Sequence, residues 1–178
     1  VVDATSGAGA FLKHLAHNLS AQSVVEIGTG SGVGALWVLE GMLASGTLTS
    51  IDDEMEHSNI AKTAFQDADI APARFRLITN PVMDVMNKLA DRAYDLVIFR
   101  HNPEDLPYAI TEAHRILRSG GVFVIDNFFG GSKVSDPAQR DPKTVALRES
   151  GKSLKNESEN WVVSLIPTGD GLLLATKL

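Results

Sequence analysis

The stretch Val24-Val-Glu-Ile-Gly-Thr-Gly-Ser-Gly-Val-Gly34 decides the fold of this chain. A short apolar run reaches a cluster of glycines, and a run of helix formers, 35–40, follows it. This order predicts a strand, a tight turn and the start of a helix. Glycine permits positive φ angles in such a turn and lets a ligand approach the backbone closely. Because the first N–H groups of a helix lack partners, we expect the turn to bind a polar or anionic group of a nucleotide-like ligand.

The glycine spacing separates two kinds of nucleotide site. The dinucleotide pattern G-x-G-x-x-G fails when counted from Gly28, because its third glycine falls on Val33. Counted from Gly30, it fits only if the strand continues through the first glycine of the turn. The pattern E-x-G-x-G-x-G fits without any shift, on Glu26, Gly28, Gly30 and Gly32. A turn that binds no ligand is the third alternative.

Length and composition set the outer bounds. The 178 residues predict a single domain over 1–178, although the chain begins at Val1 and could lack part of its N-terminus. The net charge of −6 argues against a nucleic-acid partner, and the absence of cysteine excludes disulfides and thiolate chemistry. No apolar run approaches the roughly 20 residues that cross a bilayer, so we expect no membrane partner and a cytoplasmic location.

Apolar runs and helix-like segments alternate along the chain. The predicted strands are 23–27, 47–51, 75–78, 94–99, 122–125, 161–166 and 171–176. The predicted helices are 10–18, 32–44, 55–68, 83–90, 108–117 and 144–154, with a loop over 1–9 and a turn over 118–121. Continuous apolar strands between helices predict a parallel sheet covered on both faces. The short loop 167–171 requires antiparallel neighbours, so we expect an α/β fold with five parallel strands and a C-terminal antiparallel hairpin.

Five stretches resemble the class I S-adenosylmethionine-dependent methyltransferases, in particular the catechol and caffeoyl-CoA O-methyltransferase family and its bacterial branch. They are 25–32, 48–52, 94–98, 117–127 and 165–175, and together they extend over most of the chain. The resemblance implies the Rossmann-like seven-stranded methyltransferase fold. It also implies S-adenosylmethionine-dependent methyl transfer to a hydroxyl group of a small molecule. Because many relatives dimerise, it further implies a homodimer.

The resemblance places the cofactor on the glycine turn and at the end of the second strand. Residues that would contact the methionine and ribose parts are Glu26, Gly28, Thr29, Gly30, Ser31 and Gly32. Asp52 would accept hydrogen bonds from the ribose hydroxyls, because a carboxylate is an acceptor with two oxygens; helix capping is the alternative. Met83 and Asp84 would contact adenine, with core packing as the alternative for Met83.

One position departs from the family pattern. The family binds a divalent cation through an Asp after the fourth strand and an Asp-Asn pair after the fifth. The pair is present as Asp126-Asn127, but Arg100 replaces the first Asp and Pro103 replaces a following lysine. A guanidinium at about 4 Å would repel Mg²⁺ by several kcal/mol, so we expect methyl transfer without the divalent metal.

The candidate catalytic residues are Arg100, Asp126 and His101. Arg100 could pair with Asp126 and donate hydrogen bonds to the acceptor oxygen in place of the metal, or it could only neutralise Asp126. A third alternative is that the Arg100 side chain turns outward. His101 could stack near adenine or act as a general base. The remaining histidines, His14, His17, His57 and His114, are expected to be structural or solvated.

Two other functions remain open. The loss of the family's Asp and lysine favours a protein that binds the cofactor without catalysis and has a binding or regulatory role. An NAD(P)-dependent oxidoreductase is the third possibility, because glycine-rich turns also bind dinucleotides.

Overall fold

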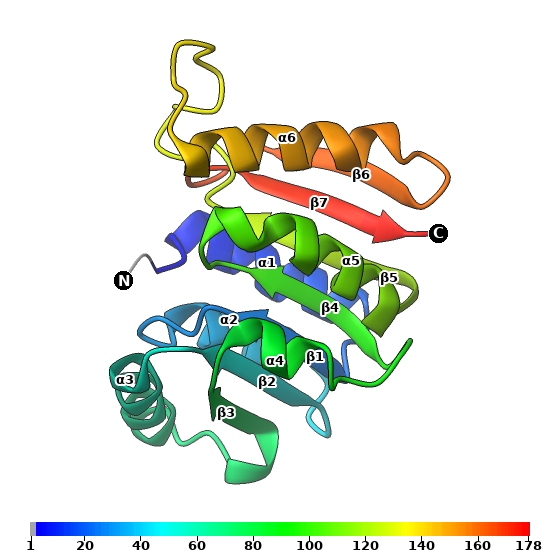
Figure 1. Cartoon of the computed structure of the whole chain (residues 1–178). Helices are drawn as coiled ribbons and strands as arrows, with labels where there is room; N and C mark the ends of the chain where they lie inside the picture. Colours follow the sequence, from blue (N-terminus) through cyan, green and yellow to red (C-terminus); the bar gives the residue numbers. More distant parts are fainter. Residues whose placement is uncertain (1–2) are drawn as a thin grey trace.

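A seven-stranded sheet forms the centre of the computed structural model, which describes residues 3–178 (Figure 1). Its strands are β1 (Ser23–Ile27), β2 (Thr47–Asp52), β3 (Phe75–Thr79), β4 (Tyr94–Phe99), β5 (Leu117–Asp126), β6 (Trp161–Ile166) and β7 (Leu172–Lys177). The strand order is β3-β2-β1-β4-β5-β7-β6, and β7 runs antiparallel to both of its neighbours. The expected parallel sheet with a closing antiparallel hairpin is therefore confirmed.

Helices cover both faces of the sheet. They are α1 (Ser6–Asn18), α2 (Val33–Gly41), α3 (Met55–Asp67), α4 (Val82–Met86), α5 (Leu106–Ile116) and α6 (Pro142–Asn156), with short 3₁₀ helices at Pro72–Arg74 and Pro103–Asp105. One buried cluster joins α1, α2 and α3 to the sheet, and a second joins α4, α5 and α6 to the other face. Val24 and Val25, which are adjacent in β1, belong to different clusters, because successive strand residues point to opposite faces.

Helix α1 begins earlier than predicted. The sequence predicts a loop over 1–9, but residues 6–9 are helical, while residues 1–2 of that loop lie outside the described range. Thr5 caps the helix, because its side chain accepts a hydrogen bond from the N–H of Ala8 at 3.3 Å. Gly9 permits close packing in the first turns, since a Cβ there would lie 2.3 Å from the Trp37 ring. The two glycines in this helix obscured the helical pattern in the sequence.

Other boundaries also differ from prediction, most of all around β5 and α4. Residues 118–121, predicted as a turn, belong to β5, which begins directly after α5 and shifts register between the pairs Tyr94–Leu117 and Leu96–Val122. Helix α4 ends at Met86 rather than at residue 90. Arg115 donates hydrogen bonds to the carbonyls of Met86 and Leu89, so the chain there is stabilised without a continuing helix.

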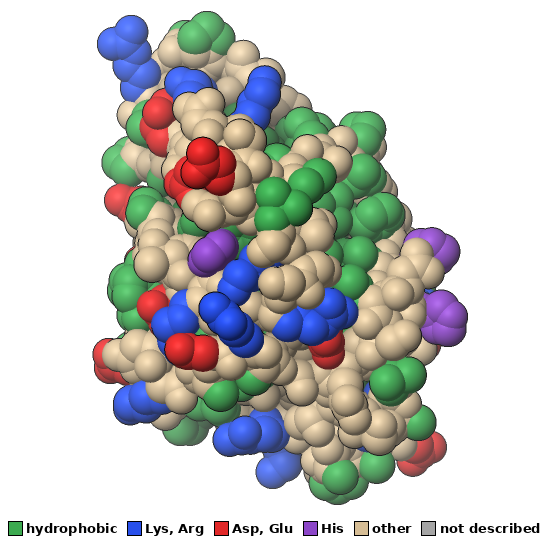
Figure 2. All heavy atoms as spheres, turned by 90° about the vertical axis from the view of Figure 1, so that its right-hand side faces the viewer, with side chains coloured by type: hydrophobic (Ala, Val, Ile, Leu, Met, Phe, Trp, Pro, Cys, Tyr) green, Lys and Arg blue, Asp and Glu red, His purple; other side chains and the backbone are tan. Residues whose placement is uncertain are grey.

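The parallel strands end together at one edge of the sheet, on the left in Figure 1, where the loops after β1, β2, β4 and β5 meet. Figure 2 shows the opposite side of the molecule, on which side chains of both charge signs are intermixed. Within residues 3–178, no helix has the length and apolar character that crossing a membrane requires. Because open α/β sheets bind ligands outside the carboxyl ends of their strands, we expect the ligand site at this edge of the sheet.

Candidate functional site

A cavity of about 310 Å³ lies at the carboxyl ends of β1, β2, β4 and β5. Its lining comprises Gly28, Gly30, Asp52, Asp53, His57, Phe99, Arg100, His101, Pro103, Ile125, Asp126, Asn127 and Leu147. The predicted site residues at the carboxyl ends of β2, β4 and β5 thus line one cavity. The size falls within the range of small-molecule pockets, which is roughly 300–1,000 Å³.

The glycine turn needs its glycines for conformation and for space. Gly28, Gly30 and Gly32 have φ angles of 92°, 56° and 88°, in the left-handed region that glycine adopts without strain. A Cβ on Gly28 would lie 2.0 Å from the carbonyl oxygen of Arg100, so the turn packs directly on the backbone after β4. Gly32 is the N-cap of α2 and offers no side chain to the free N–H groups of that helix.

Asp52 is held against the glycine turn by backbone donors. Its Oδ2 accepts the N–H groups of Thr29 at 2.9 Å and Gly30 at 3.3 Å, and its Oδ1 accepts the N–H of Glu54 at 2.9 Å. Burial would raise the pKa of Asp52, but the hydrogen bonds from Glu54, His57 and Gly30 outweigh it and hold the pKa below its usual value. The carboxylate therefore stays ionised, and it both supports the turn and faces the cavity.

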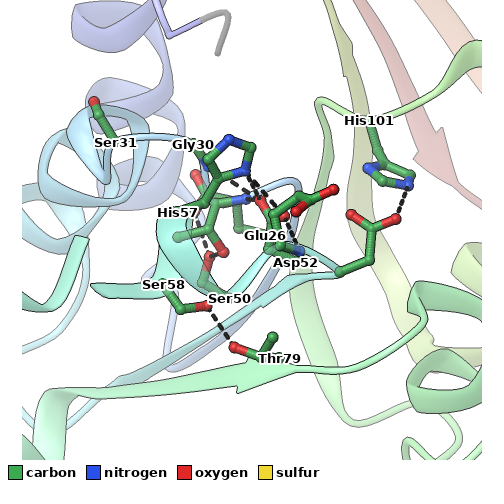
Figure 3. A network of polar contacts seen from close by, with 12 residues as sticks. Glu26, Gly30, Ser31, Ser50, Asp52, His57, Ser58, Thr79 and His101 are labelled. Atoms are coloured by element: carbon green, nitrogen blue, oxygen red, sulfur yellow. Dashed lines mark hydrogen bonds and ion pairs between the residues drawn. The ribbon is translucent and has the colours of Figure 1, made fainter. Parts of the chain in front are cut away.

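His57 belongs to this site, although the sequence predicted a structural or solvated residue. Its Nδ1 lies 3.1 Å from both carboxylate oxygens of Asp52, and the side chain lines the cavity (Figure 3). The available signal was its place in the first turn of α3, immediately after the strand that ends in Asp52. Because α3 begins beside Asp52, the side chains of its first turn lie close to that carboxylate.

Arg100 connects two buried acids. Its Nε donates to Asp126 Oδ2 at 2.8 Å, as predicted, and its Nη1 donates to Glu26 Oε2 at 3.0 Å, which was not predicted. The pKa of Glu26 is raised, because the effect of burial outweighs the lowering by the Arg100 charge and by a hydrogen bond from Ser50. Burial would lower the pKa of Arg100, but the charges of Glu26 and Asp126 outweigh this and raise it. The cluster is thus a buried network around one guanidinium.

The geometry of Arg100 favours the ion-pair alternative over donation to an acceptor oxygen. Nε and Nη1 are both used by carboxylates, and the side chain is only 4% exposed. Asp126 is equally committed, because Arg100 takes its Oδ2 and the N–H of Asn127 donates to its Oδ1 at 2.7 Å. Residues 3–178 contain no group of three or more His, Cys, Asp or Glu side chains placed to hold a metal ion. The side chains of Arg100 and Asp126 therefore do not fit a Mg²⁺ ion, which requires several oxygen ligands.

His101 lines the cavity together with Asp52. Its Nε2 is 3.6 Å from Asp105 Oδ2 and 3.8 Å from Asp53 Oδ2, and its ring meets the edge of Phe99. In Figure 3 it stands across from the Asp52–His57 pair, on a separate strand end. Since Asp53 adjoins Asp52, His101 lies within contact distance of the loop that follows β2.

The remaining predicted contacts do not line the cavity in the described part of the chain. Glu26 lies in β1, and Thr29, Ser31 and Gly32 lie in the glycine turn, but none of the four is in the cavity lining. Thr29 Oγ1 contacts Ser50 Oγ at 2.7 Å. Met83 and Asp84 lie on α4; Met83 is 38% exposed, so it is not a core residue. Their contact with adenine stays a prediction.

Comparison with known proteins agrees with this geometry. A family model described as O-methyltransferase matches residues 2–178. The chain belongs to the O-methyltransferase family. It is 44% identical over 173 residues to a protein of Mycobacterium sp. (strain KMS) described as an O-methyltransferase, a match that covers 97% of this chain and 78% of the relative.

Solved structures support the same O-methyltransferase fold. A protein from Corynebacterium glutamicum superposes with a TM-score of 0.91 at 30% identity, covering 99% of this chain and 83% of the other. The O-methyltransferase TomG from Streptomyces achromogenes, solved in complex with S-adenosylmethionine, superposes with a TM-score of 0.85 at 25% identity, covering 98% and 81%. These findings support neither the oxidoreductase nor the non-catalytic alternative.

Proposed function

We propose that this O-methyltransferase transfers the methyl group of S-adenosylmethionine to a hydroxyl of a small molecule, and that it does so without a divalent cation. The observation that carries the proposal is the Arg100 guanidinium between Glu26 and Asp126. It stands at the strand end where the resembling family has its first metal-binding Asp.

The nucleoside end of the cavity is assigned to Asp52 and its neighbours. An ionised carboxylate at a strand end suits the two ribose hydroxyls, because it accepts and never donates. His57 contacts both oxygens of Asp52, so it must share that carboxylate with the ribose or move aside. His101 forms the facing wall beside Asp53, a position that suits stacking near the nucleoside rather than proton removal at the Asp126 end. Met83 and Asp84 stay the proposed adenine contacts.

The Asp126 end is assigned to the acceptor. Phe99, Ile125 and Leu147 give this part of the lining an apolar character, which suits a hydroxylated molecule with an apolar or aromatic body. Bound S-adenosylmethionine would supply an activated methyl group on its sulfonium. The chain's own contribution is then to position the acceptor oxygen and exclude water, effects that supply much of the catalysis in a reaction of this type.

The test is turnover with and without chelator. The protein is incubated with S-adenosylmethionine and a panel of phenols, catechols and hydroxycinnamoyl esters, and S-adenosylhomocysteine is measured by mass spectrometry. We expect one or more acceptors to be methylated at the same rate in EDTA and in Mg²⁺. Loss of turnover in EDTA would overturn the metal-free proposal.

Calorimetry distinguishes the other outcomes. Binding of S-adenosylmethionine with no acceptor methylated would favour a cofactor-binding protein without catalysis. Binding of NAD in place of S-adenosylmethionine would favour the oxidoreductase. The predicted homodimer is checked separately by light scattering.

A further inference from the structure

The third nitrogen of the Arg100 guanidinium has no hydrogen-bond partner among the residues that the structure describes. Nε and Nη1 bind Asp126 and Glu26, whereas Nη2 is buried and makes no hydrogen bond within residues 3–178. A buried donor without an acceptor is costly, and most so on a charged group. The working state of the protein is therefore expected to provide an acceptor for Nη2.

Arg100 occupies space that a side chain on α2 would otherwise fill. A Cβ on Gly34 would lie 2.4 Å from Nη1 and 2.8 Å from Nη2. The guanidinium thus lies against the first turn of α2, where the free N–H groups of the helix start. A cation and a helix N-terminus at one place both attract a negative charge.

The glycine turn supplies a precedent for the binding of a carboxylate. The hydroxyl of Ser31 is also buried without a hydrogen-bond partner within the described chain. The backbone N–H of Ser31 donates to the carboxylate of Asp3 at 3.0 Å, so this turn already binds one carboxylate. An unpartnered guanidinium nitrogen beside a helix without a side-chain cap indicates an anionic ligand group rather than a cationic one.

This inference rests on the proposed cofactor. S-adenosylmethionine carries two positive centres, its sulfonium and its ammonium, and a single anionic group, its α-carboxylate. We propose that Arg100 Nη2 binds this α-carboxylate. Arg100 is then a cofactor-binding residue, and its position after β4 serves recognition of the amino-acid half of the cofactor rather than activation of the acceptor.

The test compares ligands with and without the carboxylate. Calorimetry measures binding of S-adenosylhomocysteine, decarboxylated S-adenosylhomocysteine and 5′-methylthioadenosine, which lacks the whole amino-acid half. For the wild type we expect decarboxylation to weaken binding about tenfold or more, as for a charged hydrogen bond. Arg100→Lys retains a charge for Glu26 and Asp126 but removes the guanidinium fork. In this variant the decarboxylation effect should fall to about twofold or less, with little change for 5′-methylthioadenosine.

A further variant keeps the test decisive. The triple variant Glu26→Gln, Asp126→Asn and Arg100→Gln removes the cation together with both of its buried acids, so it answers the question if Arg100→Lys does not fold. An unchanged effect in all folded variants would show that Nη2 is satisfied in another way, for example by a buried water, and would overturn the inference. If the wild type binds none of the three nucleosides, the proposed function fails instead.

Discussion

The two ends of the cavity each hold a buried acid at a strand end, but the acids are stabilised in different ways. At one end, backbone N–H groups donate to Asp52. At the other end, the side chain of Arg100 donates to Asp126. Any residue except proline offers a backbone N–H, so the environment of Asp52 depends mainly on the shape of the turn, although the His57 side chain also contacts the carboxylate. The environment of Asp126 depends on the identity of one residue, and a change there alters the chemistry while the fold stays the same.

The largest expected effect comes from removing the side-chain partner. Arg100→Leu would leave Glu26 and Asp126 buried together without a cation, which costs about 3–5 kcal/mol of unfolding free energy. Urea denaturation measures this cost. The matched control is Lys13→Met, which breaks the exposed pair with Glu40 and should cost less than about 1 kcal/mol. An equal loss of unfolding free energy in Arg100→Leu and Lys13→Met would contradict the view that Asp126 depends on the side chain of Arg100.

The backbone-supported end should show its effect mainly in binding. Asp52→Asn places an amide where the N–H groups of Thr29 and Gly30 need acceptors, so we expect a loss of about 1–3 kcal/mol in unfolding free energy. The affinity for S-adenosylhomocysteine should fall about tenfold or more, because an amide is a poorer acceptor for the ribose. Calorimetry provides the check. Asp67→Asn, at an exposed position at the end of α3 and outside the cavity lining, is the control and should change neither quantity appreciably.

A steric substitution tests how tightly Arg100 is fixed. Gly34→Ala would place a methyl group against the guanidinium, and we expect a net cost of about 1–2 kcal/mol after the helix gain of alanine. In the Arg100→Leu background the same substitution should be neutral or stabilising. A thermodynamic cycle of urea denaturation curves measures this coupling. Additive effects would mean that the guanidinium moves freely.

Acid dependence is the smallest expected effect. The folded pKa of Asp52 lies below the usual 3.8, so the unfolded chain takes up the proton first as the pH falls. The stability that Asp52 supplies is therefore complete above 3.8 and disappears as the pH falls through the folded pKa. The difference in unfolding free energy between wild type and Asp52→Asn should narrow below this pH. A difference that stays constant in acid would show that the carboxylate charge is not what supports the turn.

The fold could be predicted further than the site. The strands 23–27, 94–99 and 161–166 were predicted with the observed bounds, because apolar runs are bounded there by polar or turn-forming residues. The start of α1 was missed because glycines in a helix resemble a loop, and the bulge in β5 was read as a turn.

In the site, the strand-end acid Asp52 and the Arg100–Asp126 pair followed from the resemblance and from charge. The contacts of Glu26 with Arg100 and of His57 with Asp52 did not. These contacts depend on the conformations that the long side chains adopt between neighbouring strands and helices, and the spacing of residues in the sequence does not determine these conformations.

The most direct test of the central claim is a crystal grown with S-adenosylhomocysteine and soaked in Mn²⁺, measured for anomalous scattering. Our account predicts the nucleoside in the cavity with its ribose at Asp52, its carboxylate near Arg100, and no anomalous peak beside Asp126. A nucleoside bound elsewhere, or a manganese peak on Asp126 with Arg100 displaced, would contradict it.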